Sequence, residues 1–473
     1  MKYILHILIL SIGIFTLAGC IEDSFSTSPS DQPAFSVDTL DFGTVFTDEV
    51  TPTRRFVVYN HASKSISISD ISVSGADAGC FRLNVDGISG ESFSQVDIRG
   101  KDSIFVFVEA TLPERSGSGN AYSAQIDFTT NGVRQSLPVE AFGQNVVRLR
   151  GHIVSANERF NSDRPYQIYD SLVVAEGATL RIAAGTRLCF HDKAALIVRG
   201  RLVCDGTAEK PIVMGGDRTG NVVTDISFEI MSRQWDGVYF TMSSHNNKLS
   251  HTEIRNTSAG VVIAGTGGAD YEGRPQLELV NCILTNSGDY ALYTYHSGVK
   301  AVGCQFSEAS LGLVALIGGN HIFNHCTFAN NYLFTVIGGP AVQFSHLSSD
   351  EKTGFDDGSG LPYVKADISN SILYGLGTEV SHGDLTGTDV YIRRCLMKSE
   401  GTDDDNFINC IWNEDPLYYT VREDYIFDYR LKPESPAIGS ADPQLTLPAA
   451  SKDFYGLPRG SQPDLGAIVF TEE

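Results

Sequence analysis

Residues 280–328 read VNCILTNSGDYALYTYHSGVKAVGCQFSEASLGLVALIGGNHIFNHCTF and contain the repeat that decides the fold. Cysteines stand at positions 282, 304 and 326, so the spacing is 22 residues twice. A large apolar residue follows each cysteine two positions later. The pattern continues outward to Thr252, Ser371 and Cys395, in steps of 30, 45 and 24 residues. A recurring unit of this length is typical of a solenoid of stacked coils.

A second column of residues marks a turn in each unit. Asparagine is its commonest member, and asparagine and glycine best accept a left-handed backbone. Apolar runs such as 261–263 and 313–316 follow a few residues later. Strand, turn and strand in every unit predict the coil of a parallel β-helix. The column lies four residues after each small residue and comprises Asn256, Asn286, Glu308, Asn330, Gly375 and Ser399.

Stacked coils place like side chains about 4.8 Å apart. Small cysteines can fill the inside of such a ladder as modest hydrophobic groups. We therefore expect most of the thiols to be free and buried. A straight ladder does not offer four converging ligands, so we predict no metal site among the cysteines.

Several stretches resemble secreted right-handed β-helix proteins. Residues 177–212 are similar to the opening coils of that group, and Trp235-Asp236-Gly237-Val238 is similar to the Trp-Gly element that follows. Residues 435–438 and 463–467 resemble the closing segment, although Gly439 stands where the group often has Asp. The resemblance implies an all-β chain with a right-handed parallel β-helix, and it implies no particular activity.

Residues 34–145 predict a separate β-sandwich. Apolar and polar residues alternate over 65–69 and 124–128, and the dipeptide Asn131-Gly132 favours a hairpin. Leu40-Asp41-Phe42-Gly43 and the stretch 56–60 resemble the opening of immunoglobulin-like modules of the ASH and Hydin type. That resemblance implies a spacer or a protein-binding unit, and we find no chemistry in it.

The N-terminal residues predict export and a lipid anchor. An apolar stretch too short to span a bilayer is followed by Leu17-Ala18-Gly19-Cys20, which resembles the lipobox of bacterial lipoproteins. The resemblance implies that Cys20 becomes the lipidated first residue. Glu22 and Asp23 resemble the surface-export signal of Bacteroidetes lipoproteins, so we expect a lipid-anchored protein of the outer membrane that faces the cell surface rather than the periplasm. The predicted layout is a signal peptide over 1–19, a lipidated tether over 20–33, an Ig-like β-sandwich over 34–145, a right-handed parallel β-helix over 146–440 and a closing segment over 441–473.

The charge of the chain limits its partners. The formal net charge is −22, which would repel DNA, so we expect no nucleic-acid partner. Such a surface tolerates a polysaccharide, an envelope protein or a cation. Acidic charge also keeps exported proteins soluble, and this explanation of the charge stays open beside a role in binding a partner.

The residues just before the small column supply the candidate ligand-binding row. Strand alternation predicts that this row points outward, where His, Asn and Arg could hydrogen-bond sugars along a sheet. A plain polar outer face is the alternative. The candidates are His251, Asn281, His325, Asn370 and Arg394, with Gly303 in the same column.

Catalysis has fewer candidates. A polysaccharide lyase needs a basic residue and often Ca²⁺, and His382, Asp384, Arg393 and Arg394 are the candidate catalytic residues. Asp356-Asp357 and the run 403–405 suit solvated loops first and Ca²⁺ second. We expect a non-catalytic lipoprotein that binds a glycan or a protein through its β-helix. Two alternatives stay open: a polysaccharide lyase or other glycan-cleaving enzyme, with or without Ca²⁺ as its cofactor, and a structural subunit of an outer-membrane complex.

Overall fold

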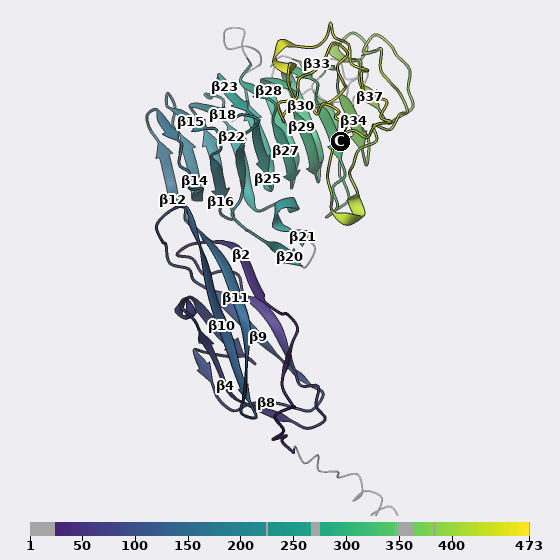
Figure 1. The fold of residues 1–473 in the computed structure, drawn as a ribbon. Coiled ribbons are helices and arrows are strands. Elements are labelled where there is room, and N and C mark those ends of the chain that lie inside the picture. The colour runs from purple at the N-terminus through teal and green to yellow at the C-terminus, as the bar shows by residue number, and fades with distance from the viewer. Residues whose placement is uncertain are drawn as a thin grey trace, which may run out of the picture. The chain divides into compact units, whose positions relative to one another are not determined.

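The computed structural model describes residues 24–223, 226–265, 275–345, 347, 363–381 and 385–472. The chain divides between Asn145 and Val146 into two compact units (Figure 1). Nearly all regular structure in the described residues is β-strand. Among these residues, no helix has the length and apolar character that crossing a bilayer requires.

The first unit is an Ig-like β-sandwich of two sheets. Phe56 and Phe128 meet between the sheets with ring centroids 6.3 Å apart, and the predicted hairpin at Asn131-Gly132 joins the last two strands. One sheet contains, in order, β1 (Ala34–Phe35), β3 (Arg54–Tyr59), β9 (Ser103–Ala110), β5 (Phe81–Val85) and β6 (Ile88–Gly90). The other contains β2 (Leu40–Phe46), β11 (Val133–Gln144), β10 (Gly119–Thr130), β4 (Ile66–Ser74) and β7 (Ser92–Phe93), with β8 (Val96–Ile98) beside β4.

The second unit is a parallel β-helix, as predicted. Each coil contributes strands to three faces in turn, and the strands of each face pair in parallel with those of the neighbouring coils. The short strands β20 (Asn221–Val223) and β21 (Ile226–Ser227) pair antiparallel with each other, outside these faces. Long strands such as β28 (Tyr290–Val302) and β30 (Gly312–Asn324) run round a corner from the third face to the first face of the next coil. We call the three parallel arrays face 1, face 2 and face 3.

The strands of the β-helix are distributed over the three faces as follows. Face 1 holds β13 (Glu158–Phe160), β15 (Thr179–Ala183), β18 (Arg201–Asp205), β23 (Asn247–Ser250), β26 (Leu277–Val280), the ends of β28 and β30, β33 (Lys365–Ser369), β36 (Asp389–Arg393) and β38 (Phe407–Ile408). Face 2 holds the starts of β12 (Val147–Val154) and β14 (Tyr166–Val174), then β16 (Arg187–Phe190), β19 (Ile212–Gly216), β24 (Thr252–Arg255), β27 (Ile283–Ser287), β29 (Gln305–Ala309), β31 (Thr327–Asn330), β34 (Ile372–Gly375) and β37 (Leu396–Met397). Face 3 holds the ends of β12 and β14, β17 (Ala195–Val198), β22 (Trp235–Phe240), β25 (Thr257–Ala264), the starts of β28 and β30, β32 (Val342–Ser345) and β35 (Val380–Ser381).

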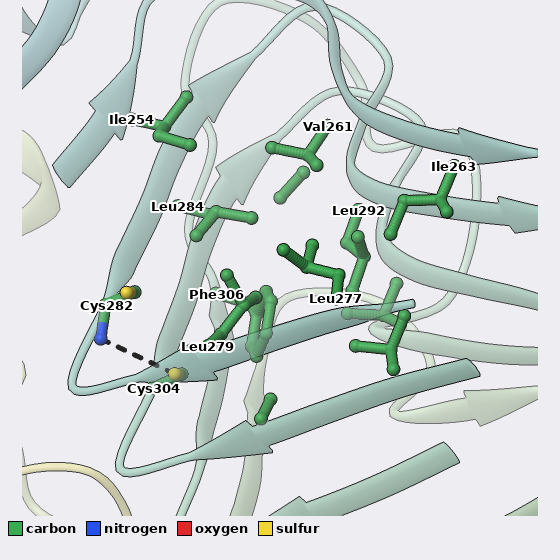
Figure 2. Packing of buried hydrophobic residues seen from close by; sticks show 14 of the residues in the cluster. Ile254, Val261, Ile263, Leu277, Leu279, Cys282, Leu284, Leu292, Cys304 and Phe306 are labelled. Atoms are coloured by element: carbon green, nitrogen blue, oxygen red, sulfur yellow. Dashed lines mark hydrogen bonds between the residues drawn. The ribbon is translucent and has the colours of Figure 1, made fainter. Parts of the chain in front are cut away.

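The cysteine column stacks as the spacing predicts. Gln305 N donates to Cys282 O at 2.9 Å, and Thr327 N donates to Cys304 O at the same distance. The three thiols are buried inside the coil, and Cys282 N lies 3.4 Å from Cys304 Sγ (Figure 2). Burial raises the pKa of the Cys282 and Cys304 thiols well above the ordinary value. The predicted free thiols are confirmed in the described residues, where six of the eight cysteines are buried.

A column of large apolar side chains fills the interior beside the cysteines. Phe306 stacks on Phe328 with ring centroids 5.3 Å apart, and Phe323 meets both rings edge-on. Trp235 lies buried against Phe190 at 4.0 Å. These contacts form one continuous core along the helix.

Left-handed residues stand at two of the corners of the β-helix in several coils. Between face 2 and face 3, Asn256, Asn286, Glu308 and Gly375 have positive φ, as predicted, whereas Asn330 and Ser399 do not. The corner between face 1 and face 2 was not predicted. There every member of the candidate ligand-binding column has φ between 42° and 65°, namely His251, Asn281, Gly303, His325, Asn370 and Arg394.

The chain after β38 forms a largely irregular C-terminal segment that covers the last coils (Figure 1). Tyr418, Leu431 and Leu465 pack against outward-facing apolar residues of face 2, including Ile372 and Leu396. The two stretches that resemble a closing segment lie together, because Leu465 N donates to Ala437 O at 3.0 Å. The segment therefore closes the late part of the helix and leaves earlier coils of face 2 uncovered.

Candidate functional site

The predicted ligand-binding row lies largely under the C-terminal segment. His325 is buried, its Nδ1 lies 3.1 Å from Asp464 O and its Nε2 lies 2.9 Å from Thr446 Oγ1. Asn370 is also buried and donates from Nδ2 to Asp442 O at 2.8 Å. Burial lowers the pKa of His325 to about 3, so its imidazole is neutral at physiological pH. The expectation that these side chains are exposed is wrong.

The physical reason is the corner itself. Strand alternation assigns an outward direction only while the backbone is extended, and a left-handed residue breaks the alternation. The corner side chains then meet the C-terminal segment. Arg394 Nε donates to Ser440 O at 2.6 Å, the His251 ring lies 6.0 Å from Phe454, and Asn281 is buried with its Nδ2 3.3 Å from His251 Nε2.

The candidate catalytic residues are not brought together in the described part of the chain. Arg393 lies on the outer surface of β36 and pairs with Asp367 on β33, while Arg394 turns the corner. His382, Asp384 and the lipidation residue Cys20 lie outside the described residues.

Of the two acidic runs proposed as Ca²⁺ ligands, only the second lies within the described residues. Asp403 Oδ1 accepts bonds from Cys410 N and Trp412 Nε1, and Asp404 Oδ1 accepts bonds from Asn406 N and Phe407 N. Asp356 and Asp357 lie outside the described residues. In the described part of the chain, no group of three or more His, Cys, Asp or Glu side chains is arranged to hold a metal ion.

A cavity of about 590 Å³ lies on the outer surface of face 2. Its floor comes from the outward-facing residues of three consecutive coils, in β24, β27 and β29. Strand register sets two short columns side by side. One column holds Glu253, Ile283 and Gln305, and the other holds Arg255, Thr285 and Ser307.

Polar groups of the floor bond to one another. Gln305 Nε2 donates to Ser307 Oγ at 3.0 Å, and Ser307 Oγ donates to Thr285 Oγ1 at 2.9 Å. Arg255 lies 3.2 Å from Glu253 Oε1 through Nη1 and 3.0 Å from Glu229 Oε1 through Nη2. Ser307 is fully buried and Gln305 is 9% exposed, so the floor presents the Arg255 guanidinium, the Thr285 hydroxyl and, least exposed, the Gln305 side chain.

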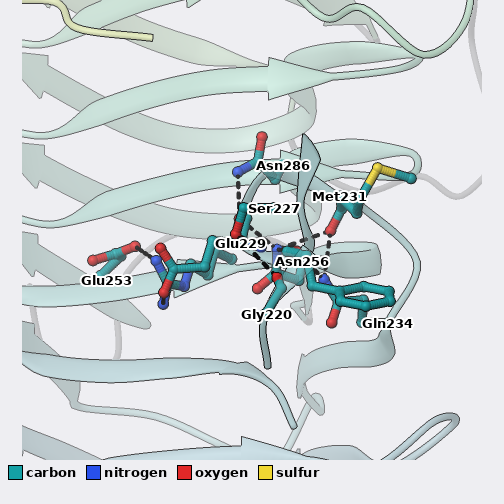
Figure 3. A network of polar contacts seen from close by, with 10 residues as sticks. Gly220, Ser227, Glu229, Met231, Gln234, Glu253, Asn256 and Asn286 are labelled. Carbon is teal, nitrogen blue, oxygen red and sulfur yellow. Dashed lines mark hydrogen bonds and ion pairs between the residues drawn. The ribbon is translucent and has the colours of Figure 1, made fainter. Parts of the chain in front are cut away.

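One wall is the loop that carries the short 3₁₀ helix η2 (Phe228–Ile230). Asn256 holds this loop, because its Nδ2 donates to the carbonyls of Phe228, Glu229 and Met231 at 3.2, 2.7 and 2.8 Å (Figure 3). Asn286 Nδ2 adds a bond to Glu229 O at 3.1 Å. The left-handed corner therefore both turns the chain and fixes the wall.

The opposite wall is the C-terminal segment. Tyr429 donates its hydroxyl to Glu308 Oε1 and accepts from Asn331 Nδ2 at 3.1 Å. Glu308 Oε2 accepts from Asn331 N at 3.2 Å, and burial raises the pKa of Glu308 to about 8. The rim of this wall carries Tyr455, which is 53% exposed.

Each carboxylate that lines the cavity has a partner. Glu229 and Glu253 share Arg255, Glu308 binds Tyr429, and Asp428 binds Arg430 with Oδ2 2.7 Å from Nη2. The cavity therefore offers many donors and acceptors, and its charges are locally compensated. Chemically, this arrangement suits a neutral ligand rich in hydroxyl groups.

No pattern recognised in the sequence indicated this site. The floor could have been predicted from the sequence, because the register that stacks the cysteines also places residues 253, 283 and 305 in one outward column. The two walls could not be predicted in this way, because both are formed by segments without a repeat.

Comparisons with known proteins give no family. No protein-family model and no curated protein match the chain. Among solved structures, a protein of unknown function from Porphyromonas gingivalis matches at 11% identity with a TM-score of 0.18, over 26% of this chain and 50% of that chain. The ASH/PapD-like domain of human CEP192 matches at 14% identity with a TM-score of 0.18, over 25% of this chain and 89% of that chain.

A third solved structure covers more of the chain. The catalytic unit of a GH87 alpha-1,3-glucanase from Streptomyces thermodiastaticus matches at 8% identity with a TM-score of 0.15, over 70% of this chain and 89% of that chain. This chain thus spans half the length of the Porphyromonas protein. Likenesses at these identities and TM-scores carry no argument about function.

Proposed function

We propose that this chain is a cell-envelope lipoprotein that binds a glycan, without cleaving it, in the cavity on face 2. The observation that carries the proposal is the floor of that cavity, where three consecutive coils place Arg255, Thr285 and Gln305 side by side and the buried Ser307 hydroxyl bonds to two of them. Rigid strands hold these groups in place, so little conformational entropy is lost when a ligand binds.

The chemistry of the lining favours a sugar. Amide, hydroxyl and guanidinium groups exchange hydrogen bonds with water in the empty cavity and with hydroxyl groups of a bound sugar. The exposed Tyr455 at the rim supplies an apolar ring face against which a pyranose ring can pack. Because the lining carboxylates are bonded to arginine or tyrosine, no free pair of acids is left for hydrolysis.

Calorimetry on a panel of hexasaccharides tests the proposal. The panel contains cellohexaose, xylohexaose, mannohexaose, the N-acetylglucosamine hexamer and hexagalacturonate. We expect at least one to bind, and we expect Gln305→Ala and Tyr455→Ala each to weaken that binding about tenfold, the loss of one good polar or stacking contact. Tyr391→Ala, which removes a half-exposed tyrosine from face 1, serves as the matched control and should bind normally. Binding that both cavity variants leave unchanged, or no binding on the panel, would refute the assignment.

One observation favours a glycan-cleaving enzyme as the second candidate. A carboxyl group with a pKa of about 8 is protonated at neutral pH, as a general acid must be, and Glu308 lines the cavity. Incubation with the corresponding polysaccharides separates the two functions. New reducing ends or products that absorb in the ultraviolet, lost in Glu308→Gln, would establish cleavage, whereas unchanged polymers support binding alone.

The proposed location rests on the N-terminal residues. The lipobox-like Leu17–Cys20 and the acidic residues behind it support a lipid anchor at Cys20 in the outer membrane, on the cell surface. Labelled palmitate should enter the wild-type protein and not Cys20→Ala, and protease added to intact cells should degrade the wild-type protein. A labelled Cys20→Ala variant, or full protection from protease, would count against this location.

A further inference from the structure

A second concave site lies on the first coils of face 1 and is rich in arginine. A cavity of about 370 Å³ is lined by Arg159, Arg181 and Arg201, together with Asn157, Glu158 and Thr179. Arg159 and Arg181 are register partners on the adjacent strands β13 and β15. Arg201 on β18 is the register partner of Thr179 on β15. Three guanidinium groups thus come from three successive rungs, each about 4.8 Å from the next.

The positive charge of this cavity is only partly neutralised. Arg181 pairs with Asp205, and Glu158 is engaged by His152 Nε2 at 3.0 Å. Arg201 donates from Nε to the carbonyl of Asn246 at 2.8 Å. Within the described residues, the Arg159 guanidinium has neither an ion pair nor a hydrogen-bond partner. Like charges placed directly opposite on neighbouring strands are unfavourable unless something of opposite charge joins them.

The same column on later coils shows the contrasting arrangement. Continuing from Arg181, the register runs through Val203 to Lys248, Glu278 and Lys300. There the signs alternate, and Glu278 lies 3.7 Å from Lys248 Nζ and 3.6 Å from Lys300 Nζ. On these later coils an acid therefore separates the two lysines, whereas at the beginning of the column Arg159 and Arg181 stand directly opposite each other. In a chain of net charge −22, such a pair of adjacent arginines stands out.

We propose that the arginine cavity formed by Arg159, Arg181 and Arg201 is an anion-binding site for the carboxylate or sulfate groups of an acidic glycan. Guanidinium forks match the planar or tetrahedral oxygens of such groups and bind them through paired, charge-assisted hydrogen bonds. The hydroxyl of Thr179 and the amide of Asn157 line the same cavity and can bond the neighbouring sugar hydroxyls. The site is separate from the face 2 cavity, so it does not depend on the function proposed there.

Fluorescence anisotropy on the full chain with labelled probes tests the site. The probes are hexagalacturonate for carboxylate, a heparin-derived hexasaccharide for sulfate, isomaltohexaose as the neutral sugar and oligothymidylate as the phosphate polymer. We expect at least one acidic sugar to bind, the neutral sugar to bind far more weakly, and added salt to weaken the acidic complex.

Two variants and one control locate the binding. Arg159→Gln leaves the Arg181–Asp205 pair intact, and we expect it to weaken the acidic complex about tenfold, the loss of one charge-assisted contact. Arg159→Gln combined with Arg201→Gln should weaken it further. Arg187→Gln removes the same charge from an exposed arginine of β16 on face 2 and should bind like the wild type.

The outcomes are distinct from those of the face 2 cavity. Loss in the Arg159 and Arg201 variants, with normal binding by Gln305→Ala, supports the arginine site whatever happens at face 2. Equal loss in Arg187→Gln, no loss in the arginine variants, no binding by either acidic sugar, or tighter binding of oligothymidylate than of both sugars would overturn the proposal. Unchanged tryptophan fluorescence of each variant confirms that it is folded, since Trp235 and Trp412 both lie in the second unit.

Discussion

Replacing Glu308 by glutamine should change how the stability of the β-helix depends on pH. In the folded chain, burial raises the pKa of Glu308 from 4.5 to about 8, and the bonds from Tyr429 and Asn331 offset only part of this effect. Between these two pH values the folded state holds a proton that the unfolded state has released. Stability therefore falls as pH rises through this interval and levels off above the folded pKa.

The size of the effect follows from the same interval. Each pH unit in which one extra proton is held by the folded state is worth about 1.4 kcal/mol, so the interval costs the wild type about 5 kcal/mol by pH 8. Glutamine does not titrate and escapes this loss. It keeps an acceptor for the Tyr429 hydroxyl but loses the acceptor for Asn331 N, which costs about 1 kcal/mol. The variant should be slightly less stable than the wild type below pH 5 and more stable by about 4 kcal/mol above pH 8.

Urea unfolding at a series of pH values measures this difference. The chain has two tryptophans, Trp235 and Trp412, and both lie in the second unit, so tryptophan fluorescence follows the β-helix alone. The control is Tyr429→Phe, which keeps the carboxyl and removes a donor that lowers its pKa, so pH dependence should persist and move to higher pH. A stability difference between Glu308→Gln and wild type that stays constant from pH 5 to pH 9 would refute the reasoning.

One further prediction concerns the core. Phe306→Ala removes a buried ring that stacks on Phe328 and meets Phe323, so we expect a loss of about 3–5 kcal/mol in the free energy of unfolding, again followed by tryptophan fluorescence. Val336→Ala, at a side chain that is 93% exposed, should change it by less than about 0.5 kcal/mol, and equal losses in the two variants would contradict the assigned core.

The rungs of the helix could be predicted because a parallel ladder repeats its environment. Cys282, Cys304 and Cys326 meet the same neighbours one coil apart, so a small residue that suits one rung suits the next, and the spacing becomes visible in the sequence. The turn at Asn256 and Asn286 was visible for the same reason. Asparagine tolerates the left-handed backbone that the corner has at both positions.

The first corner shows where this reasoning fails. His, Asn and Gly are among the residues that accept positive φ, so His251, Asn281 and Gly303 carried the signal of a turn. At Gly303 the corner also excludes a side chain, because a Cβ at this position would lie 2.2 Å from Asn281 Oδ1. Period-two alternation assigned the column to a strand instead. The error followed from extending a strand by one residue into the corner.

The walls of the face 2 cavity could not be predicted, because they depend on contacts that no periodicity records. Tyr429 and Glu308 are 121 residues apart in the chain, and His325 and Asp464 are 139 residues apart. Such pairs follow from how an irregular segment packs on the coils. The sequence between 409 and 472 contains apolar residues for that packing but no repeat that would give their partners.

The site therefore arises where the repeat is interrupted. Successive coils of face 2 have the same backbone, so nothing in the repeat distinguishes one stretch of its outer surface from another. The difference comes from two segments outside the repeat. The loop before β22 is fixed by Asn256, and the C-terminal segment is fixed at Glu308 by Tyr429. Between them, three rungs stay accessible and become a cavity. Removing the Asn256 amide should free the loop wall without disturbing the rungs, because the bonds that Nδ2 makes are all to that loop.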